Sequence, residues 1–237
     1  MDWEAIWNRA RTDLTVVTDR GDADLFLFEH SARVSQTAQR IAAIPAVRSQ
    51  APDEAALVAA ALYHEAGWVV RLREGRSRRD EILVRPLAEA DREEGARMAE
   101  RSLKSLLSAE SLRKAARALR SLGDREIESV EGRIVSDADN LLEFGLLSLW
   151  MTVRRGAFEG RGVKAAIDTW RRRKEYHFWD ARLKDAFNFA DVRTIAERRL
   201  ASLEGFMQEL EAEDAGADLG LGEPGSREVA SAKATEE

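Results

Sequence analysis

The stretch ALYHEAGW (61–68) places a histidine and a carboxylate, His64 and Glu65, side by side at the end of an apolar helix. The residues just before this pair, 53–63, are mostly Ala, Leu and Val, and Gly67 is a typical helix stop signal. Small apolar residues precede His64 at helical spacing, so its imidazole projects from the apolar face. A lone histidine in such a position is most often a core residue with a single hydrogen bond.

Two further predicted helices also carry polar side chains on an apolar face. A helix over 24–43 places His30 on its apolar side, and a buried helix over 130–145 is interrupted by Asp137 and Asp139. Asp139 shares a face with apolar residues, where an unpaired carboxylate costs on the order of several kcal/mol or takes up a proton. The sequence therefore predicts inward-facing polar groups on three separate helices.

A divalent cation accounts for these polar groups together. Two neutral imidazoles and two carboxylates match a dication in charge and in ligand type. The alternative is that His30, His64, Glu65 and Asp139 are unrelated buried residues, each with its own partner. Spacing along the sequence does not decide between the two, because the ligands come from distant segments.

Length and composition favour one mostly helical domain. The chain has 237 residues and only four prolines, which suits a single well-filled core. We expect an all-α domain over 1–212, with its core at about 24–150 and C-terminal helices at about 160–212. The stretch 213–237 has no aromatic residue and predicts a disordered tail. One stripe of the last helix packs on the body or on a second subunit, which leaves a homodimer open. That stripe comprises Val192, Ala196, Leu203, Phe206 and Leu210.

Composition also limits where in the cell the protein is expected and which classes of partner it is expected to bind. No apolar run approaches the ~18 to 20 residues needed to cross a bilayer, and the first residues lack the apolar region of a signal peptide. The absence of cysteine fits a cytoplasmic protein. A formal net charge of −6 argues against general nucleic-acid binding, since such proteins present a basic face to phosphates.

Basic residues offer partners for a phosphate group in three places. Arg33 shares a helix side with His30, and arginines crowd the stretch 69–91, where a solvated run competes with capture of a phosphate. The basic and aromatic stretch 171–187 allows contact with a nucleotide, although its aromatic residues are more simply interpreted as one packing face. The arginines of the first stretch are Arg71, Arg73, Arg76, Arg78, Arg79 and Arg85. The packing face comprises Tyr176, Trp179, Leu183, Ala186 and Phe187.

The order of these elements resembles the HD-domain superfamily of metal-dependent phosphohydrolases. Its members carry a histidine, then a His-Asp pair and then a later aspartate, all on helices, and the matching stretches here are EHSARV, ALYHEAGW and IVSDADNLLEFG. The last of these, preceded by Val130-Glu131, is similar to the small bacterial branch that includes nucleotide pyrophosphohydrolases. The C-terminal stretches YHFWDARLKDAF and RTIAERRLASLEGFMQELEAE also look like that branch. The resemblance covers about residues 24–211.

The resemblance implies an HD-domain helical bundle with a C-terminal helical extension and one bound divalent metal ion. The implied metal ligands are His30, His64, Asp139 and Glu65, which replaces the usual aspartate, with Asp137 behind them. Mn²⁺, Fe²⁺, Co²⁺, Ni²⁺ and Zn²⁺ all suit such a ligand set.

The implied activity is hydrolysis of a phosphoester or phosphoanhydride in a small phosphorylated substrate, a nucleotide in particular. The metal would activate a bound water, and Asp137 or Glu65 would accept its proton. Arg33 or the arginines of 71–79 would hold the phosphate charge.

Three positions depart from the pattern of that branch. Leu122 stands near the place of a further histidine, Leu142 replaces an acidic residue, and Ala181 falls where a lysine is expected. Two alternatives to an enzyme therefore stay open. One is a degenerate HD domain that binds metal or nucleotide as a regulatory module, and the other is a purely structural helical protein.

Overall fold

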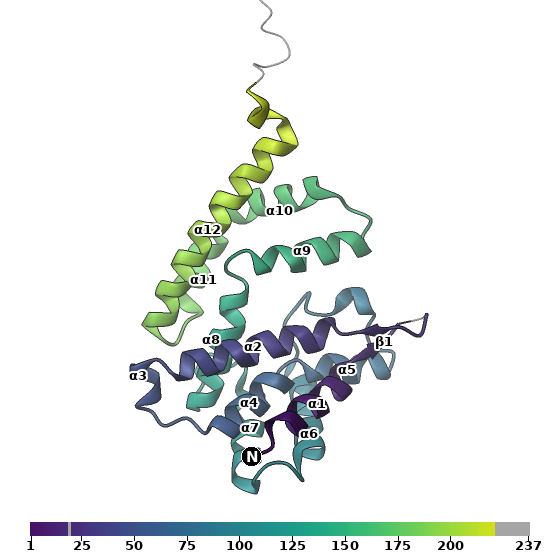
Figure 1. Cartoon of the computed structure of the whole chain (residues 1–237), viewed down its shortest axis with the longest axis vertical. Helices are drawn as coiled ribbons and strands as arrows, with labels where there is room; N and C mark the ends of the chain where they lie inside the picture. Colours follow the sequence, from purple (N-terminus) through teal and green to yellow (C-terminus); the bar gives the residue numbers. More distant parts are fainter. Residues whose placement is uncertain (19, 221–237) are drawn as a thin grey trace, which may run out of the picture.

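The chain is helical almost throughout, which confirms the predicted all-α fold class. The computed structural model describes residues 1–18 and 20–220, and Figure 1 shows their arrangement. The first half contains α1 (Trp3–Leu14), β1 (Val16–Val17), β2 (Ala23–Asp24), α2 (Phe26–Ala42), α3 (Pro45–Arg48), α4 (Glu54–Tyr63), α5 (Ala66–Arg73), the 3₁₀ turn η1 (Arg79–Glu81), α6 (Glu89–Leu103) and α7 (Ala109–Ser121). The second half contains α8 (Val130–Leu142), α9 (Leu147–Phe158), α10 (Val163–Glu175), α11 (Phe178–Asp185), α12 (Ala190–Ala215) and η2 (Ala217–Leu219).

Helix α4 lies at the centre of the bundle, and every residue from 55 to 63 is buried. Its sequence is apolar on all sides, as expected of a helix surrounded by others, and α2, α6, α7 and α8 pack around it. Asp53 caps its first turn by accepting a hydrogen bond from the backbone N–H of Ala56 at 3.0 Å. The backbone N–H of Asp53 donates in turn to Glu131 of α8 at 2.8 Å. These contacts fix the position of α4 relative to α8.

The prediction that Gly67 stops this helix was wrong. Helix α4 ends at Tyr63, and Gly67 lies inside the next helix, α5. A Cβ at Gly67 would collide with the backbone oxygen of Asp91 in α6, so glycine is needed for the close contact of the two helices. His64 and Glu65 therefore occupy a bend between two helices.

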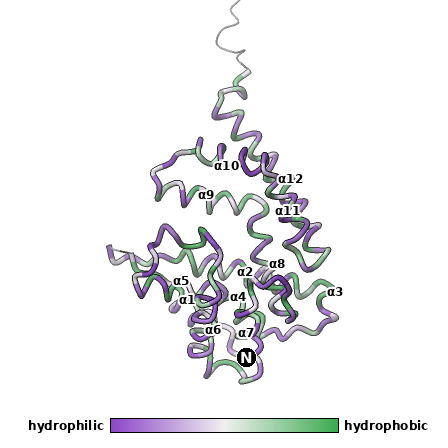
Figure 2. The backbone as a smooth tube through the Cα atoms, turned by 180° about the vertical axis from the view of Figure 1, so that it is seen from behind, coloured by the Kyte–Doolittle hydropathy of each residue, from purple (hydrophilic) through white to green (hydrophobic). Residues whose placement is uncertain are grey.

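Helices α9 to α12 form a second layer on one side of the bundle formed by α1 to α8 (Figure 1). Helix α12 contacts α8, α10 and α11, and along it the tube in Figure 2 alternates between hydrophilic and hydrophobic colours. The predicted packing faces of this layer were partly wrong. Tyr176 is 79% exposed, against its predicted place in a packing face. On α12, Phe206 is exposed and its neighbour Met207 is buried, which leaves open the predicted alternative that this stripe packs on a second subunit.

The two ends of the chain also differ from expectation. A short antiparallel hairpin pairs Val16–Val17 with Ala23–Asp24, two strands that the all-α prediction did not include. Helix α12 continues to Ala215, beyond the predicted start of the tail at 213, and most of the predicted disordered tail (221–237) lies outside the described residues. Within the described residues, no helix has the length and apolar character to span a membrane.

Candidate metal centre and its pocket

Three helices of the bundle bring polar side chains to one place. Helix α2 carries His30, α4 is followed directly by His64, and α8 carries Asp139. Both α2 and α8 pack against α4, so residues distant in sequence become neighbours. His30 lies on the buried face of α2, as the helical spacing predicted.

The ligand atoms of these residues lie close together. Nε2 of His30 is 3.2 Å from Nε2 of His64 and 3.3 Å from Oδ1 of Asp139, and Nε2 of His64 is 3.6 Å from that same oxygen. Atoms that bind one first-row metal ion at ~2 Å in a tetrahedron lie about 3.3 Å from one another. The two imidazoles are buried, whereas the Asp139 side chain is 40% exposed. The geometry therefore suits a metal ion that is reached from one side.

The other ring nitrogen of His64 is also engaged. Nδ1 lies 2.8 Å from the backbone carbonyl oxygen of Ala61, so it must carry a proton and donate it. In the neutral imidazole this leaves a lone pair on Nε2, the atom that faces His30 and Asp139. A backbone carbonyl commonly fixes metal-binding histidines in this way. His64 is thus oriented as a ligand by the preceding turn of its own helix.

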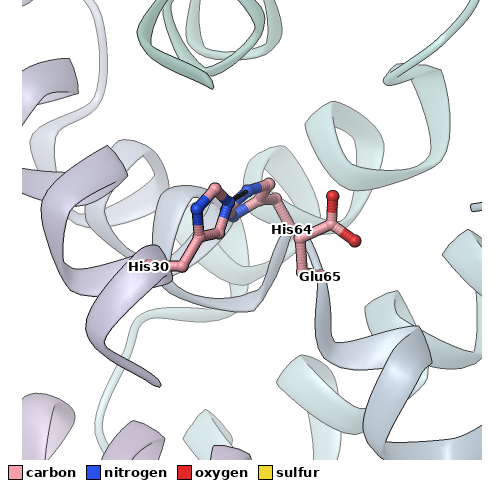
Figure 3. Close-up of side chains that lie close together, drawn as sticks. All are labelled: His30, His64 and Glu65. Atoms are coloured by element: carbon pink, nitrogen blue, oxygen red, sulfur yellow. Dashed lines mark hydrogen bonds between the residues drawn. The ribbon is translucent and has the colours of Figure 1, made fainter. Parts of the chain in front are cut away.

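Glu65 lies beside this cluster with an unsatisfied oxygen. Its Oε2 is buried and has no hydrogen-bond partner among the described residues. One carboxylate oxygen of Glu65 and one nitrogen of each of His30 and His64 lie within 4.8 Å of one another. Figure 3 shows the carboxylate beside the His64 ring, on the side away from His30. Burial raises the pKa of Glu65 to about 8, because the charged form lacks solvation. A cation would supply the charge partner that this carboxylate lacks.

The charges of the cluster are strongly coupled. Burial lowers the pKa of His30, and with the charges of His64 and Arg33 it outweighs the neighbouring Asp139, which raises this pKa. Burial acts on His64 in the same direction, but the contact and charge of Asp139, together with the charge of Glu65 and the bond to Ala61, outweigh it and raise the pKa of His64. Burial alone would raise the pKa of Asp139, and the two histidines instead hold it well below its usual range. Asp139 therefore stays ionised, so these side chains fit a divalent cation in both charge and donor type.

Asp137 does not join this cluster. Its fully buried carboxylate accepts hydrogen bonds from the backbone and side-chain nitrogens of Asn188, at 2.8 and 2.7 Å, and from the backbone N–H of Phe189 at 3.0 Å. Burial raises its pKa, although these donors oppose the shift. Both oxygens are occupied by the segment that leads into α12. The geometry thus favours an anchoring role over the expected role as proton acceptor.

The cluster lines a pocket of about 780 Å³ between the bundle and α9. Arg33 lines it, as its helix position suggested, and its closest acidic partner is Glu29 at 3.9 Å. Leu122 and Leu142, which stand at positions where the related branch has polar groups, also face this pocket. Ala181 is exposed, and its neighbour Arg182 lines the pocket instead.

Most arginines of the stretch 69–91 are engaged elsewhere, against the expectation that they capture phosphate. Arg71 and Arg76 both bind the buried carboxylate of Asp91 at 2.9 Å. Of the six arginines, Arg85 lines the pocket. The remaining three contact the backbone oxygen of Asp13 (Arg73), Asp80 (Arg78) and Asp24 (Arg79).

Several pocket residues lie in the C-terminal layer, where the sequence favoured packing. Arg182 donates to Asn140 at 2.6 Å and pairs with Glu143 at 3.0 Å. Arg173 lies over the ring of Phe178, 4.9 Å from its centroid, and has no ion-pair partner among the described residues. Burial lowers its pKa. The basic residues of 171–187 could have indicated that this stretch lines the pocket. The aromatic residues of the same stretch favoured a prediction of packing instead.

Comparisons with known proteins agree with this geometry. The model of the HD domain family matches residues 27–143, whereas no curated protein sequence matches the chain. A solved structure described as a "predicted HD superfamily hydrolase", from an uncultured Thermotogales bacterium, is 20% identical with a TM-score of 0.56, covering 89% of this chain and 92% of that one. Bacillus subtilis YpgQ in complex with ADP is 19% identical with a TM-score of 0.54, covering 91% and 96%. A structure of Bacillus subtilis YpgQ described without ADP is 20% identical with a TM-score of 0.55, covering 90% of this chain and 97% of that one. At these identities the structural likeness shows the fold alone.

Proposed function

Because the chain belongs to the HD-domain superfamily, we propose that it is a metal-dependent phosphohydrolase acting on a small nucleotide or another phosphoester or phosphoanhydride. The observation that carries this proposal is the convergence of His30, His64 and Asp139 within 3.6 Å, beside the unpartnered Oε2 of Glu65. The complex of YpgQ with ADP supports a nucleotide-like substrate. A divalent ion bound here would lower the pKa of a water molecule and polarise a phosphoryl oxygen.

The side chains of the cluster have different roles in the proposed reaction. His30, His64 and Asp139 would hold the ion with Glu65 as a fourth ligand, and the contact of His64 with the carbonyl of Ala61 keeps its Nε2 directed inward. Hydrolysis joins the oxygen of water to phosphorus, breaks the bond from phosphorus to the leaving oxygen and releases one proton from the water. We expect Glu65 to accept that proton through its unpartnered Oε2, since both oxygens of Asp137 are engaged by residues 188 and 189.

Arginines around the pocket hold the phosphate group in this proposal. Arg33 adjoins the cluster on α2, three residues after His30, and Arg173 approaches from α10. Arg173 is held on an aromatic ring and has no carboxylate partner among the described residues, so a phosphate would supply the missing charge. The arginines bound to Asp91 have no such role.

Phosphate release by metal-stripped and Mn²⁺-loaded protein tests the proposal. We expect hydrolysis of ADP, ATP or p-nitrophenyl phosphate only after loading. Asp139→Ala should weaken Mn²⁺ binding by more than about 100-fold and abolish turnover, because it removes a charged ligand. Asp185→Ala is the matched control, since Asp185 also lines the pocket but lies outside the cluster. Turnover by metal-free Asp139→Ala would reject the mechanism.

A regulatory module that binds metal or nucleotide without turnover is the second candidate. The observation that favours it is the apolar character of Leu122 and Leu142, which face the pocket at positions where the related branch has polar groups. Wild-type protein that binds Mn²⁺ and hydrolyses none of the three compounds would establish this alternative.

A further inference from the structure

The pocket has two walls that come from different parts of the chain. His30, His64 and Asp139 belong to the segment 27–143 that matches the HD family, whereas the facing residues from 147 to 188 lie beyond it. The volume of about 780 Å³ falls in the range typical of small-molecule sites, ~300–1,000 Å³. A metal ion and one phosphate group occupy only a part of such a volume. The second wall is therefore free to contact the rest of a substrate.

Trp150 of α9 is the most unusual residue of this second wall. It lines the pocket and is 60% exposed, while the other five tryptophans of the chain are buried or half-buried. Its ring takes part in none of the aromatic or cation–π contacts found in the described structure. Leu147 and Met151, on the same helix, line the pocket next to it. A large flat apolar surface is thus presented to the pocket without a protein partner.

The chemistry of this wall favours a planar ring over a charged group. An indole offers a flat π-face and one N–H donor, and it carries no charge to hold a phosphate. The neighbouring hydroxyls are already engaged, since Ser148 donates to the carbonyl of Gly145 at 2.8 Å and Thr152 to that of Ser148 at 3.4 Å. Helix α9 therefore presents stacking surface with few free hydrogen-bonding groups.

We propose that Trp150 stacks on the nucleobase of a bound nucleotide whose phosphates lie at the cluster of His30, His64 and Asp139. The placement of the phosphates rests on the proposed function, whereas the stacking rests on Trp150 and the pocket alone. Because every base has a π-face and α9 offers few free donors or acceptors, the subsite selects nucleotides over base-free phosphates and discriminates little among bases.

Calorimetric titration of two ligands, each supplied as its non-hydrolysable methylene analogue, into Mn²⁺-loaded protein tests the subsite. ADP carries a base and inorganic pyrophosphate does not. Trp150→Ala should raise the Kd of ADP by about 5- to 150-fold, the range that corresponds to loss of one base–aromatic stack. The Kd of pyrophosphate should stay the same, and Trp150→Phe should retain most of the ADP affinity. Val153→Ala is the matched control, because Val153 is exposed on α9 but does not line the pocket.

The outcomes separate this subsite from the proposed activity. Equal weakening of both ligands, no weakening of ADP, or wild-type protein that binds ADP no more tightly than pyrophosphate would each overturn the subsite. Selective loss of ADP affinity in Trp150→Ala, together with no hydrolysis by wild type, would keep the subsite and reject the phosphohydrolase. Hydrolysis of ADP with the same kcat/KM in Trp150→Ala and wild type would keep the phosphohydrolase and reject the subsite.

Discussion

The two walls of the pocket are held in place by different forces. Helices α2, α4 and α8 pack against one another through buried faces, whereas α9 has no buried residue in the described structure. Helix α9 instead reaches the bundle through Arg154, which donates to Asp24 at 3.0 Å and lies 3.7 Å from the ring centroid of Phe26. These contacts and the half-buried Leu149 and Met151 hold α9 less firmly than fully buried faces hold α2, α4 and α8. The metal wall is therefore the fixed one, and the Trp150 wall is the adaptable one.

The largest expected contrast is between two identical substitutions, one in each wall. Leu62 in α4 is fully buried, and Leu147 in α9 is 54% exposed. Leu62→Ala should lower the free energy of unfolding by ~2–5 kcal/mol, through lost burial and a cavity. Leu147→Ala should change it by less than about 0.5 kcal/mol. Urea unfolding followed by circular dichroism measures both, and equal losses would refute the contrast between the walls.

Asp137 joins the two layers, and its substitution distinguishes an anchor from a catalytic group. Asp137→Asn removes the charge and turns an N–H₂ group toward the donors on Asn188 and Phe189, which should cost ~1–3 kcal/mol of stability. Mn²⁺ affinity should stay within about threefold of wild type, since groups that support metal ligands typically change it by ~10–100-fold. Thermal unfolding and calorimetry measure the two effects. A tenfold loss of Mn²⁺ affinity without loss of stability would indicate that Asp137 acts at the metal site and not as an anchor.

The fixed wall was largely predictable from the sequence. Helical spacing placed His30 on a buried face, and the Ala, Leu and Val residues of α4 indicated an apolar helix, because both conclusions depend on local sequence. The spacing also suggested that Asp139 turns inward, and it does reach the histidines while staying partly open to the pocket. The anchoring of Asp137 was not predictable, since its partners lie about fifty residues away and bind largely through backbone N–H groups.

The adaptable wall was much less predictable. The aromatic stretch that contains Trp179 was interpreted as packing, and this holds for Trp179 and Phe187 but not for Tyr176. Arg173 faces the pocket through contacts between helices that no local pattern encodes. The prediction that Gly67 stops a helix was wrong for a similar reason. A small residue is needed at this position because α6 packs closely against it, and not because its own helix ends there. Tertiary contacts decided these positions.

The link between Asp24 and Arg154 should make the attachment of α9 dependent on pH. Burial alone would raise the pKa of Asp24, but its bonds to Arg79, Phe26 and Arg154 outweigh this and lower it. A carboxylate with a lowered folded-state pKa contributes stability above its unfolded value of about 3.9, and that contribution is lost as pH falls through the folded value. Asp24→Asn should therefore cost about 1 kcal/mol at pH 7, and the difference from wild type should shrink below pH 4.

Exposed Asp22 provides the control for this prediction. It stands two residues before Asp24 and has no ion-pair partner among the described residues. Asp22→Asn should leave the free energy of unfolding unchanged, within about 0.5 kcal/mol, at both pH values. A cost of Asp24→Asn that stays constant from pH 7 to pH 3 would show that its charge does not hold α9.

The last expected effect concerns Glu65, the residue at which the fixed wall departs from the His-Asp pattern. A turn of Glu65 toward Arg71 or Arg73 would indicate a decayed site, but Arg71 binds Asp91 and Arg73 the backbone oxygen of Asp13. One carboxylate oxygen of Glu65 and one nitrogen of each imidazole lie within 4.8 Å of one another, and a gap opens wherever such a distance exceeds the ~3.3 Å between ligands of one ion. The longer arm of glutamate allows the carboxylate to close this gap by rotation, since no hydrogen bond holds Oε2 in the described structure.

Glu65→Asp should therefore weaken Mn²⁺ binding by about tenfold, because metal sites are sensitive to ligand displacements of ~0.2 Å and aspartate is shorter by one methylene. The stability of the metal-free protein should not fall, since the substitution shortens a buried carboxylate that has no partner to lose. Calorimetric titration of Mn²⁺ into both proteins, with urea unfolding in the presence of a chelator, separates the two effects. Tighter binding of Mn²⁺ by Glu65→Asp would show that glutamate is not a ligand here, and it would shift the balance from a phosphohydrolase to a module that binds without turnover.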